Sequence, residues 1–252
     1  MPDTERAEST RLLHPMSQNK NQLELDELKN LVFRISHSLK SPLASSEGLL
    51  DILESELADQ LSEDQKKYIA GVRTNIRLVN RMGEDLVEFC RVGEARSAYS
   101  ECSLQEIVTA LTETVNFSYP QKSIAWKIPR QLPNVYCDSG DLATVFENLL
   151  NNAAKYSRPE NQCIVEIEFQ ELPRFYAFHV RDNGIGVSPS EKENAFELFH
   201  RGSNVGQIEG TGLGLAICSR IIKKYGGFMS LKPRRKYGVS VSFTLPKASA
   251  AS

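Results

Sequence analysis

Apolar residues recur every three or four positions along the N-terminal part of the chain, over residues 21–57 and, more regularly, over 69–89. This spacing gathers them on one face of an α-helix. The polar stretch 58–64 interrupts the pattern, and Ser62 within it is a suitable N-cap for the second helix. The pattern therefore predicts two amphipathic helices joined by a short turn, a helical hairpin.

One hairpin cannot cover both of its apolar stripes. Pairing two copies into a four-helix bundle would bury them, whereas packing against the rest of the same chain is the alternative, and the stripes alone leave both open. Residues 1–19 contain Pro2 and Pro15 among many polar side chains. We therefore expect a flexible N-terminal arm ahead of the hairpin.

The pattern changes after Gly93, and residues 93–103 are expected to form a linker. Beyond it we expect helices near 104–117, 139–156 and 213–225, and strands near 123–128, 163–170, 174–181, 227–232 and 238–245. This mixture lacks regular β-α-β alternation and predicts an α+β sandwich. The expected organisation is a flexible arm at 1–19, the hairpin at 20–96, the sandwich at 97–246 and a flexible tail at 247–252.

Composition and charge set broad limits. With 40% hydrophobic and 25% charged residues among 252, the chain is typical of a soluble globular protein. A net charge of −2 offers no basic field for nucleic acid. No apolar run reaches the roughly 18 residues of a membrane span, and the polar N-terminus does not resemble a secretory signal. The five scattered cysteines indicate reduced thiols and a cytoplasmic location.

Three clusters in the second half carry candidate chemistry. In the first, Asn148, Asn152 and Lys155 follow one another at intervals of one helical turn, so they share a helix face. Amide oxygens suit a hard cation such as Mg²⁺, and a lysine suits phosphate. Taken alone, an ordinary polar helix face explains this cluster equally well.

The second and third clusters are rich in glycine. Asp182-Asn-Gly184-Ile-Gly186 follows an expected strand, and an aspartate there could accept a hydrogen bond from an exocyclic amine such as that of adenine. A plain turn is its alternative. Gly210-Thr-Gly-Leu-Gly214 opens an apolar helix, where free N–H groups favour phosphate. It matches neither a P-loop nor a Rossmann fingerprint.

In order and spacing, the three clusters resemble the N, G1 and G2 boxes of the GHKL ATP-binding fold, which histidine kinases share with gyrase-type topoisomerases and heat-shock ATPases. The segment 196–201, FELFHR, resembles the F box of histidine kinases, and 36–43, SHSLKSPL, resembles their H box. The resemblance spans roughly residues 20–246. It implies a sensor histidine kinase, with an α-helical hairpin of HisKA type forming a dimeric four-helix bundle, followed by an α+β two-layer sandwich ATP-binding domain.

The resemblance also implies roles toward ATP and Mg²⁺. Asn152 would coordinate Mg²⁺, Asn148 would lie beside it near the triphosphate, and Asp182 would bind the adenine amino group. A mobile lid over 187–211 would order on ATP binding, with Arg201 helping to neutralise the γ-phosphate. The other implied ATP-binding positions are Lys155, Tyr156, Gly184, Gly186, Gly210, Thr211, Gly212, Leu213 and Gly214.

Position 148 separates the subfamilies of this fold. Its ATP-hydrolysing members generally place a water-activating glutamate there, and an asparagine amide cannot take a proton from water at neutral pH. Glu147 is adjacent but lies about 100° around the helix, so we expect it to face elsewhere. Asn148 therefore favours transfer to a protein nucleophile over hydrolysis.

His37 in the H box would be the phosphoacceptor, because a neutral imidazole near pH 7 is a competent nucleophile. The family usually has Glu or Asp directly after this histidine, where this chain has Ser38. A hydroxyl cannot take the imidazole proton as a carboxylate can. Ser41 occupies the place where related kinases often hold Thr or Asn to orient water for phosphatase action.

The second helix could supply the missing carboxylate. If the hairpin turns near residue 60, His37 should lie level with about residue 83 on the antiparallel helix. Three acids near that level are hypothesised to reach the imidazole: Glu84, Asp85 and Glu88.

The sequence thus predicts a histidine kinase core that autophosphorylates His37 from Mg-ATP and passes the phosphoryl group to an aspartate of a response regulator. We expect a homodimer through residues 20–92. Because no sensor domain precedes residue 20, we expect input from a separate sensor protein or a missing N-terminal sensor. Ser38 favours the alternative of an ATP-binding pseudokinase or adaptor, while a GHKL ATPase or serine/threonine kinase is disfavoured by Asn148 and the H box.

Overall fold

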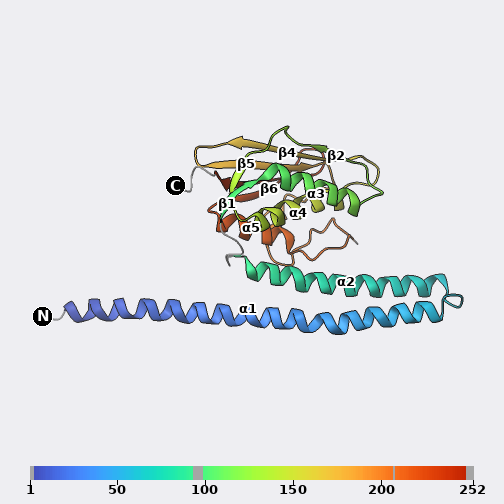
Figure 1. The fold of residues 1–252 in the computed structure, drawn as a ribbon, viewed down its shortest axis with the longest axis horizontal. Coiled ribbons are helices and arrows are strands. Elements are labelled where there is room, and N and C mark those ends of the chain that lie inside the picture. Colours follow the sequence, from blue (N-terminus) through green and yellow to red (C-terminus); the bar gives the residue numbers. More distant parts are fainter. Residues whose placement is uncertain (1–2, 93–98, 207, 248–252) are drawn as a thin grey trace. The chain divides into compact units, whose positions relative to one another are not determined.

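The computed structural model describes residues 3–92, 99–206 and 208–247 (Figure 1). It divides into two compact units, Met1–Arg91 and Val92–Ser252. This division lies close to the expected boundary near residue 97. Most of the expected linker, 93–98, and the expected tail after Lys247 lie outside the described residues.

The first unit is the predicted helical hairpin. Helix α1 spans Asp3–Glu56 and helix α2 spans Glu63–Arg91. Ser62 caps α2 as expected: its Oγ accepts from the Gln65 N–H at 3.3 Å, and the Gln65 side chain accepts from the Ser62 N–H at 2.8 Å. This reciprocal pair is a capping box, which fixes where the second helix begins.

The expected arm at 1–19 is wrong for its backbone, because α1 already begins at Asp3. The segment 3–14 is rich in glutamate, arginine, alanine and leucine, which are good helix formers. Local propensity therefore extends the helix N-terminally beyond the amphipathic stripe that predicted it.

Ion pairs across the hairpin set its register. Arg77 pairs with Glu47 at 3.2 Å, and Arg73 reaches both Asp51 and Glu54, at 2.6 and 2.5 Å. Among the hairpin side chains that the structure describes, from Asp26 on, few are buried, Ile69 and Ile76 among them. The exposed large apolar residues of this described part are Leu28, Leu31, Phe33, Ile35, Leu39, Leu49, Ile52, Leu53, Tyr68, Val72 and Val79.

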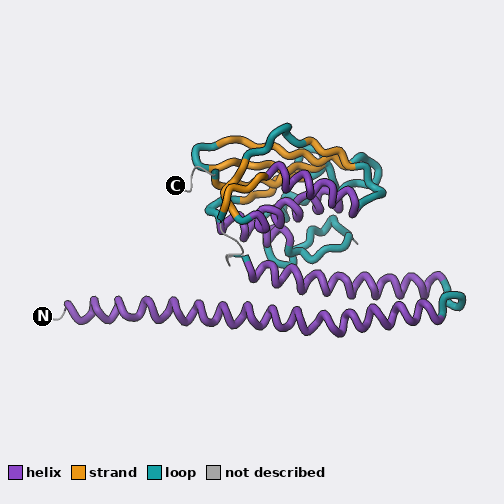
Figure 2. Tube along the Cα trace, in the orientation of Figure 1, coloured by secondary structure: helices purple, strands orange, loops and turns teal. Residues whose placement is uncertain are grey.

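The second unit is a two-layer sandwich, as predicted. Its mixed sheet has the strand order β2-β4-β5-β7-β6, with β2 and β4 parallel and the other pairs antiparallel. The strands are β2 Ile124–Lys127, β4 Cys163–Glu171, β5 Phe175–Asp182, β6 Met229–Pro233 and β7 Val239–Pro246. One face of the sheet is covered by helices α3 Leu104–Ser118, α4 Ser139–Lys155 and α5 Gly214–Lys224 (Figure 2).

Two short strands were not predicted. Strand β1, Ser100–Ser103, falls in the expected linker, and β3, Asn134–Cys137, falls in an expected loop. They pair antiparallel as a separate two-stranded sheet. Four-residue strands are too short to show a clear period, and their pairing depends on a partner more than 30 residues away. A short 3₁₀ helix, Asn194–Phe196, lies between β5 and α5.

Three phenylalanines form the centre of the sandwich core. Phe146 from α4 contacts Phe178 and Phe243 from the sheet, with ring centroids 6.1 and 5.5 Å apart. Such edge-to-face and stacked rings bury large apolar area at low entropic cost. Because Phe146 lies one residue before Glu147, this core also fixes the rotation of α4.

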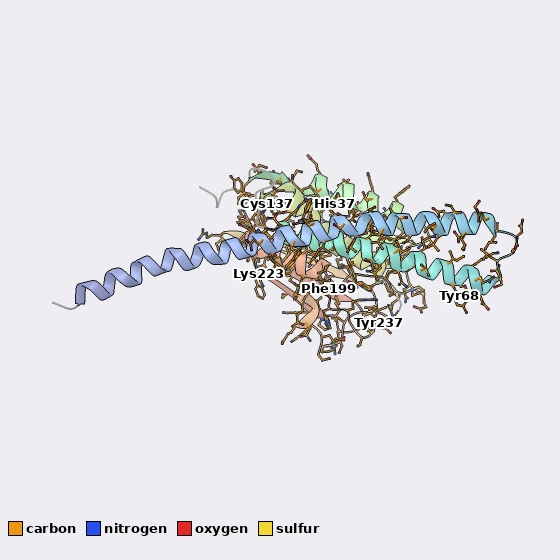
Figure 3. All side chains as sticks on the ribbon, turned by 90° about the horizontal axis from the view of Figure 1, so that it is seen from below. His37, Tyr68, Cys137, Phe199, Lys223 and Tyr237 are labelled. Atoms are coloured by element: carbon orange, nitrogen blue, oxygen red, sulfur yellow. The ribbon has the colours of Figure 1, made fainter. Side chains whose placement is uncertain are left out.

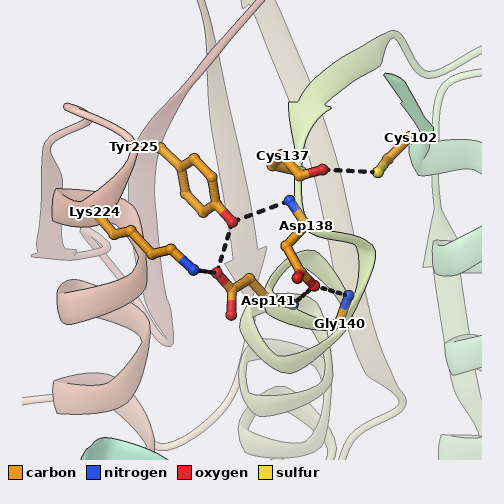
Figure 4. Close-up of polar contacts among 7 residues, drawn as sticks. All are labelled: Cys102, Cys137, Asp138, Gly140, Asp141, Lys224 and Tyr225. Carbon is orange, nitrogen blue, oxygen red and sulfur yellow. Dashed lines mark hydrogen bonds and ion pairs between the residues drawn. The ribbon is translucent and has the colours of Figure 1, made fainter. Parts of the chain in front are cut away.

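A buried polar network ties the start of α4 to the end of α5 (Figure 4). Asp141 is 1% exposed and accepts from Lys224 Nζ at 2.8 Å and from the Tyr225 hydroxyl at 2.6 Å. That hydroxyl in turn accepts from the Asp138 N–H at 3.0 Å. Burial first, and the bond to Asp141 second, raise the pKa of Tyr225.

All five cysteines are free thiols, as expected. Burial raises the pKa of Cys137 and of Cys218, so both stay protonated and act as small apolar groups. Among the described residues, no helix is both long enough and apolar enough to span a bilayer.

Candidate active site

Helix α4 brings the predicted amide cluster to one face. Asp138 caps its start by accepting from the Gly140 and Asp141 N–H groups at 2.8 and 3.3 Å. The Asn148 side chain donates to the Thr144 carbonyl at 2.9 Å. Its Oδ1 thereby faces Gly214, where an added Cβ would lie 2.4 Å from it. Glu147 is exposed, which agrees with the expectation that it faces elsewhere.

The loop after β5 packs directly on the end of α4. The Ile185 N–H donates to the Tyr156 carbonyl at 3.0 Å. A Cβ at Gly184 would lie 2.4 Å from that same carbonyl oxygen, so only glycine permits the approach. The first and second sequence clusters are therefore brought into contact.

The Asp182 carboxylate is held at the base of this loop. It is 8% exposed and accepts from the Gly184 N–H at 2.8 Å and the Val239 N–H at 3.4 Å. Burial raises its pKa, against a lowering by those two hydrogen bonds and by Arg234. One carboxylate oxygen thus makes both bonds, which leaves the second as the acceptor for a ligand.

Two residues that support Asp182 were not found from the sequence. A Cβ at Gly238 would lie 2.0 Å from the Asp182 carbonyl oxygen, and Arg234 donates to that oxygen at 3.0 Å. Gly186, with φ +78°, packs against Gly238. From the sequence alone, Gly238 is only the first residue of an expected strand. Its contact with Asp182 could not be predicted, because the two residues lie more than 50 positions apart.

Asn183, in contrast, has a structural role. Its side chain accepts from the Ile164 N–H at 2.9 Å and donates to the Gln162 carbonyl at 2.9 Å. These bonds close the start of β4 against the end of β5. The D-N-G sequence therefore combines a ligand-binding candidate, Asp182, with a residue that holds the loop.

The third glycine cluster meets the first. A Cβ at Gly210 would lie 2.5 Å from Lys155 Nζ and 3.3 Å from the Tyr156 hydroxyl. Lys155 Nζ itself lies 4.8 Å from the centre of the Tyr156 ring. Burial raises the pKa of Tyr156, while the nearby charge of Arg201 lowers it. These contacts place Lys155, Tyr156 and Arg201 around one site.

Two members of this cluster serve the fold. The Leu213 side chain is fully buried, so it belongs to the core and only its backbone could face a ligand. Its N–H donates to the Thr211 Oγ1 at 3.3 Å, and Thr211 is also buried. Gly212 adopts φ +74° against the backbone of Phe199, which has φ +62°. The segment 196–201, which resembles the F box, therefore packs on the third cluster.

Arg201 is folded back onto the expected lid. Its Nη2 donates to the Ile208 carbonyl at 2.6 Å and to the Gly206 carbonyl at 3.4 Å. Backbone carbonyls are replaceable partners, since a phosphate oxygen is a stronger acceptor for a guanidinium. The arrangement permits Arg201 to turn to an anion once one is bound.

The site suits a magnesium ion only together with phosphates. The described residues contain no group of three or more His, Cys, Asp or Glu side chains that could hold a metal ion. The amide oxygens of Asn148 and Asn152 are hard donors one helical turn apart. The residues therefore fit Mg²⁺ that arrives with a nucleotide.

His37 lies exposed on α1, away from the hairpin turn marked by Tyr68 (Figure 3). The preceding Ser36 is buried against Gly83 of α2, where an added Cβ would lie 3.6 Å from the Ser36 Cβ. The expected level of His37 with about residue 83 is thus confirmed. Ser38 and Ser41 are both exposed.

Comparison with known proteins agrees with this site. Residues 137–249 match the family described as "Histidine kinase-, DNA gyrase B-, and HSP90-like ATPase". Cyanobacterial phytochrome A of Nostoc sp. is 30% identical over 222 residues, 87% of this chain and 28% of that protein. The adaptive-response sensory kinase SasA of Synechocystis sp. is 30% identical over 223 residues, 84% of this chain and 57% of that protein. The chain belongs to the histidine kinase family.

Solved structures share its fold, that of a histidine kinase among them. Full-length ShkA in complex with AMPPNP superposes with a TM-score of 0.63 at 25% identity, over 86% of this chain and 45% of that one. The histidine kinase AdeS of Acinetobacter baumannii, at 18% identity and TM-score 0.57, shows the fold over 84% of this chain and 98% of that one. The chain spans between about a quarter and 57% of the length of these curated relatives.

Proposed function

We propose that this chain is a kinase core that phosphorylates its own His37 from Mg-ATP and passes the phosphoryl group to an aspartate of a response regulator. The observation that carries the proposal is the convergence of two glycine-rich segments, the loop after β5 and the segment 210–214 that opens α5, on the second half of α4. At Gly184, Gly210 and Gly214 a Cβ would meet Tyr156, Lys155 and Asn148, respectively. These close packings, which a side chain would prevent, bring the three sequence clusters together around Lys155 and Tyr156.

Each side chain has a role that follows from its surroundings. Asp182 accepts from the adenine amino group, because its buried carboxylate is fixed by two backbone donors. The Tyr156 ring flanks the base or ribose, and Lys155 beside it supplies charge to the phosphates. Arg201 neutralises charge at the γ-phosphate after leaving the lid carbonyls.

Mg²⁺ would be held by the Asn152 amide oxygen, with Asn148 alongside. When bound, it would offset the negative charge of the phosphates. Since neither asparagine can take a proton from water, the site favours transfer to an external nucleophile. The exposed imidazole of His37 is such a nucleophile.

The hairpin supports a homodimer through residues 20–92. Its exposed leucines, isoleucines and valines would be covered by the hairpin of a second copy in a four-helix bundle. Monomeric proteins rarely leave so extended an apolar surface in water. A response-regulator receiver domain and a separate or N-terminal sensor are the further partners of this proposal.

The test is incubation of the chain with γ-labelled ATP and Mg²⁺. We expect acid-labile label that is lost in His37→Ala and that moves to a receiver domain on mixing. Because Ser38 replaces an acidic residue, a pseudokinase is the second candidate, and ATP binding without label would establish it. Acid-stable label would instead indicate a serine/threonine kinase and overturn the proposal.

A further inference from the structure

Phosphoryl transfer to His37 requires a base, if the proposed function is correct. One ring nitrogen attacks the γ-phosphorus with its lone pair, and the bond from that phosphorus to the bridging oxygen breaks, with its electrons leaving on ADP. The other ring nitrogen then carries a proton that must be removed to give neutral phosphohistidine. A carboxylate is suited to take it.

Helix α1 offers no base beside the acceptor. His37 stands between Ser36 and Ser38, and neither hydroxyl takes a proton at neutral pH. The nearest acids along the helix, Glu27 and Glu47, are ten residues away, or about 15 Å of helix rise. A base must therefore come from another element.

Helix α2 approaches α1 closely at this level. Gly83 has no side chain, and Ser36 is buried against it, so the two backbones come near one residue before His37. The next residue of α2 is Glu84. Its Oε1 accepts from Lys40 Nζ at 3.0 Å.

That ion pair links Glu84 to a residue within one helical turn of His37. Lys40 follows His37 by three residues, which is about 4.5 Å along the helix and about 60° around it. Both side chains of the pair are more than half exposed, at 57% and 59%. An ion pair in that setting contributes little, so Glu84 can leave Lys40 and turn toward His37.

We propose that Glu84 is the general base for His37, taking the ring N–H proton as the nitrogen–phosphorus bond forms. Glu84 is the acid of α2 that follows Gly83 and pairs with Lys40, a residue within one turn of the acceptor on α1. The hairpin thereby supplies from its second helix the carboxylate that Ser38 does not.

The test compares initial rates of acid-labile labelling in the full chain with γ-labelled ATP and Mg²⁺. We expect Glu84→Gln to slow labelling at least about a hundredfold, the lower end of the range for loss of a general base. Glu84→Asp should retain more activity than Glu84→Gln. ATP affinity, measured by calorimetry, should be the same in both variants and the wild type.

Glu47→Gln is the matched control. It removes a carboxylate that also forms an ion pair across the hairpin, with Arg77 at 3.2 Å. Glu47 lies ten residues from His37 along α1, too far along the helix to act on it. Normal labelling in Glu47→Gln with slow labelling in Glu84→Gln supports the proposal. Wild-type rates in Glu84→Gln, or an equal loss in Glu47→Gln, overturn it while leaving the kinase function intact. If the wild type takes no acid-labile label, the proposed function itself fails.

Discussion

At the scale of single residues, the site depends on groups whose surroundings differ from water. Asp182 is the clearest case, since a carboxylate is held nearly out of solvent by two backbone N–H donors. Burial of a charge costs free energy of folding unless a partner compensates it. A buried acceptor that also lowers stability is typical of a ligand-binding position.

Asp182→Asn should therefore separate stability from binding. Burial raises the pKa of Asp182 in the folded chain. A group with a raised folded pKa contributes stability in full below the unfolded pKa, about 3.9, and loses it as pH rises through the folded pKa. In urea titrations, the free energy of unfolding of Asp182→Asn relative to wild type should rise from pH 4 to pH 7.

ATP affinity should fall in Asp182→Asn. The amide can still accept from Gly184 and Val239, but it is a weaker acceptor for the adenine amine, and we expect at least about a tenfold loss of affinity by calorimetry. A variant that binds ATP normally would show that Asp182 does not contact the nucleotide.

Gly214→Ala tests the close approach of the Gly214 backbone to Asn148. Its Cβ would lie 2.4 Å from Asn148 Oδ1, so the amide must rotate and give up its bond to Thr144. We expect about a tenfold loss of ATP affinity and about 1 kcal/mol of stability. Gly71→Ala is the control, since nothing lies within 4 Å of its Cβ. It should stabilise α2 by about 0.5–1 kcal/mol and leave ATP binding unchanged.

At the scale of elements, the buried network of Asp141, Lys224 and Tyr225 joins α4 to α5. The same two helices carry Asn148, about two turns from Asp141, and Gly214, nearly three turns from Lys224. Because packed helices are stiff, a tie at one end limits how far they can move apart at the other. The network thus serves the nucleotide site although it touches none of its residues.

Asp141→Leu should cost about 3–5 kcal/mol of stability, because it leaves the Lys224 ammonium, only 9% exposed, without its carboxylate. Adding Lys224→Met should recover much of that loss. Thermal or urea unfolding measures both. The exposed pair of Lys67 with Asp64, in which both side chains are 74% exposed, is the comparison, and Asp64→Asn should change stability by no more than about 1 kcal/mol. Equal costs for the two pairs would contradict this reasoning.

At the scale of the whole molecule, the two units distribute apolar surface differently. The largest fully buried side chains of the described residues all belong to the second unit, from Leu104 to Leu245. Among the described side chains of the hairpin, Ile69 and Ile76 are the buried apolar ones, and many large apolar residues are exposed. The second unit therefore has a core of its own, whereas the hairpin buries little apolar surface by itself.

Val72→Glu with Val79→Glu should break the homodimer. Both valines are at least 40% exposed and lie two turns apart on one face of α2, where two charges would be buried by a second hairpin. Analytical ultracentrifugation should show a monomer for this variant. Ala70→Glu adds a charge about 160° around the same helix and should leave the dimer intact. A dimeric double variant would rule out this face as the interface.

The sequence by itself determined whatever depends on neighbours within a few residues. The common face of Asn148, Asn152 and Lys155 follows from the helical period alone, and Ser62 and Gln65 complete a cap across one turn. Tertiary structure alone decided the contacts between distant segments. The pairing of β1 with β3, the approach of Gly238 to Asp182, and the contact of Glu84 with Lys40 each join residues more than 30 positions apart. No local pattern encodes such contacts, because they depend on how the packed elements meet.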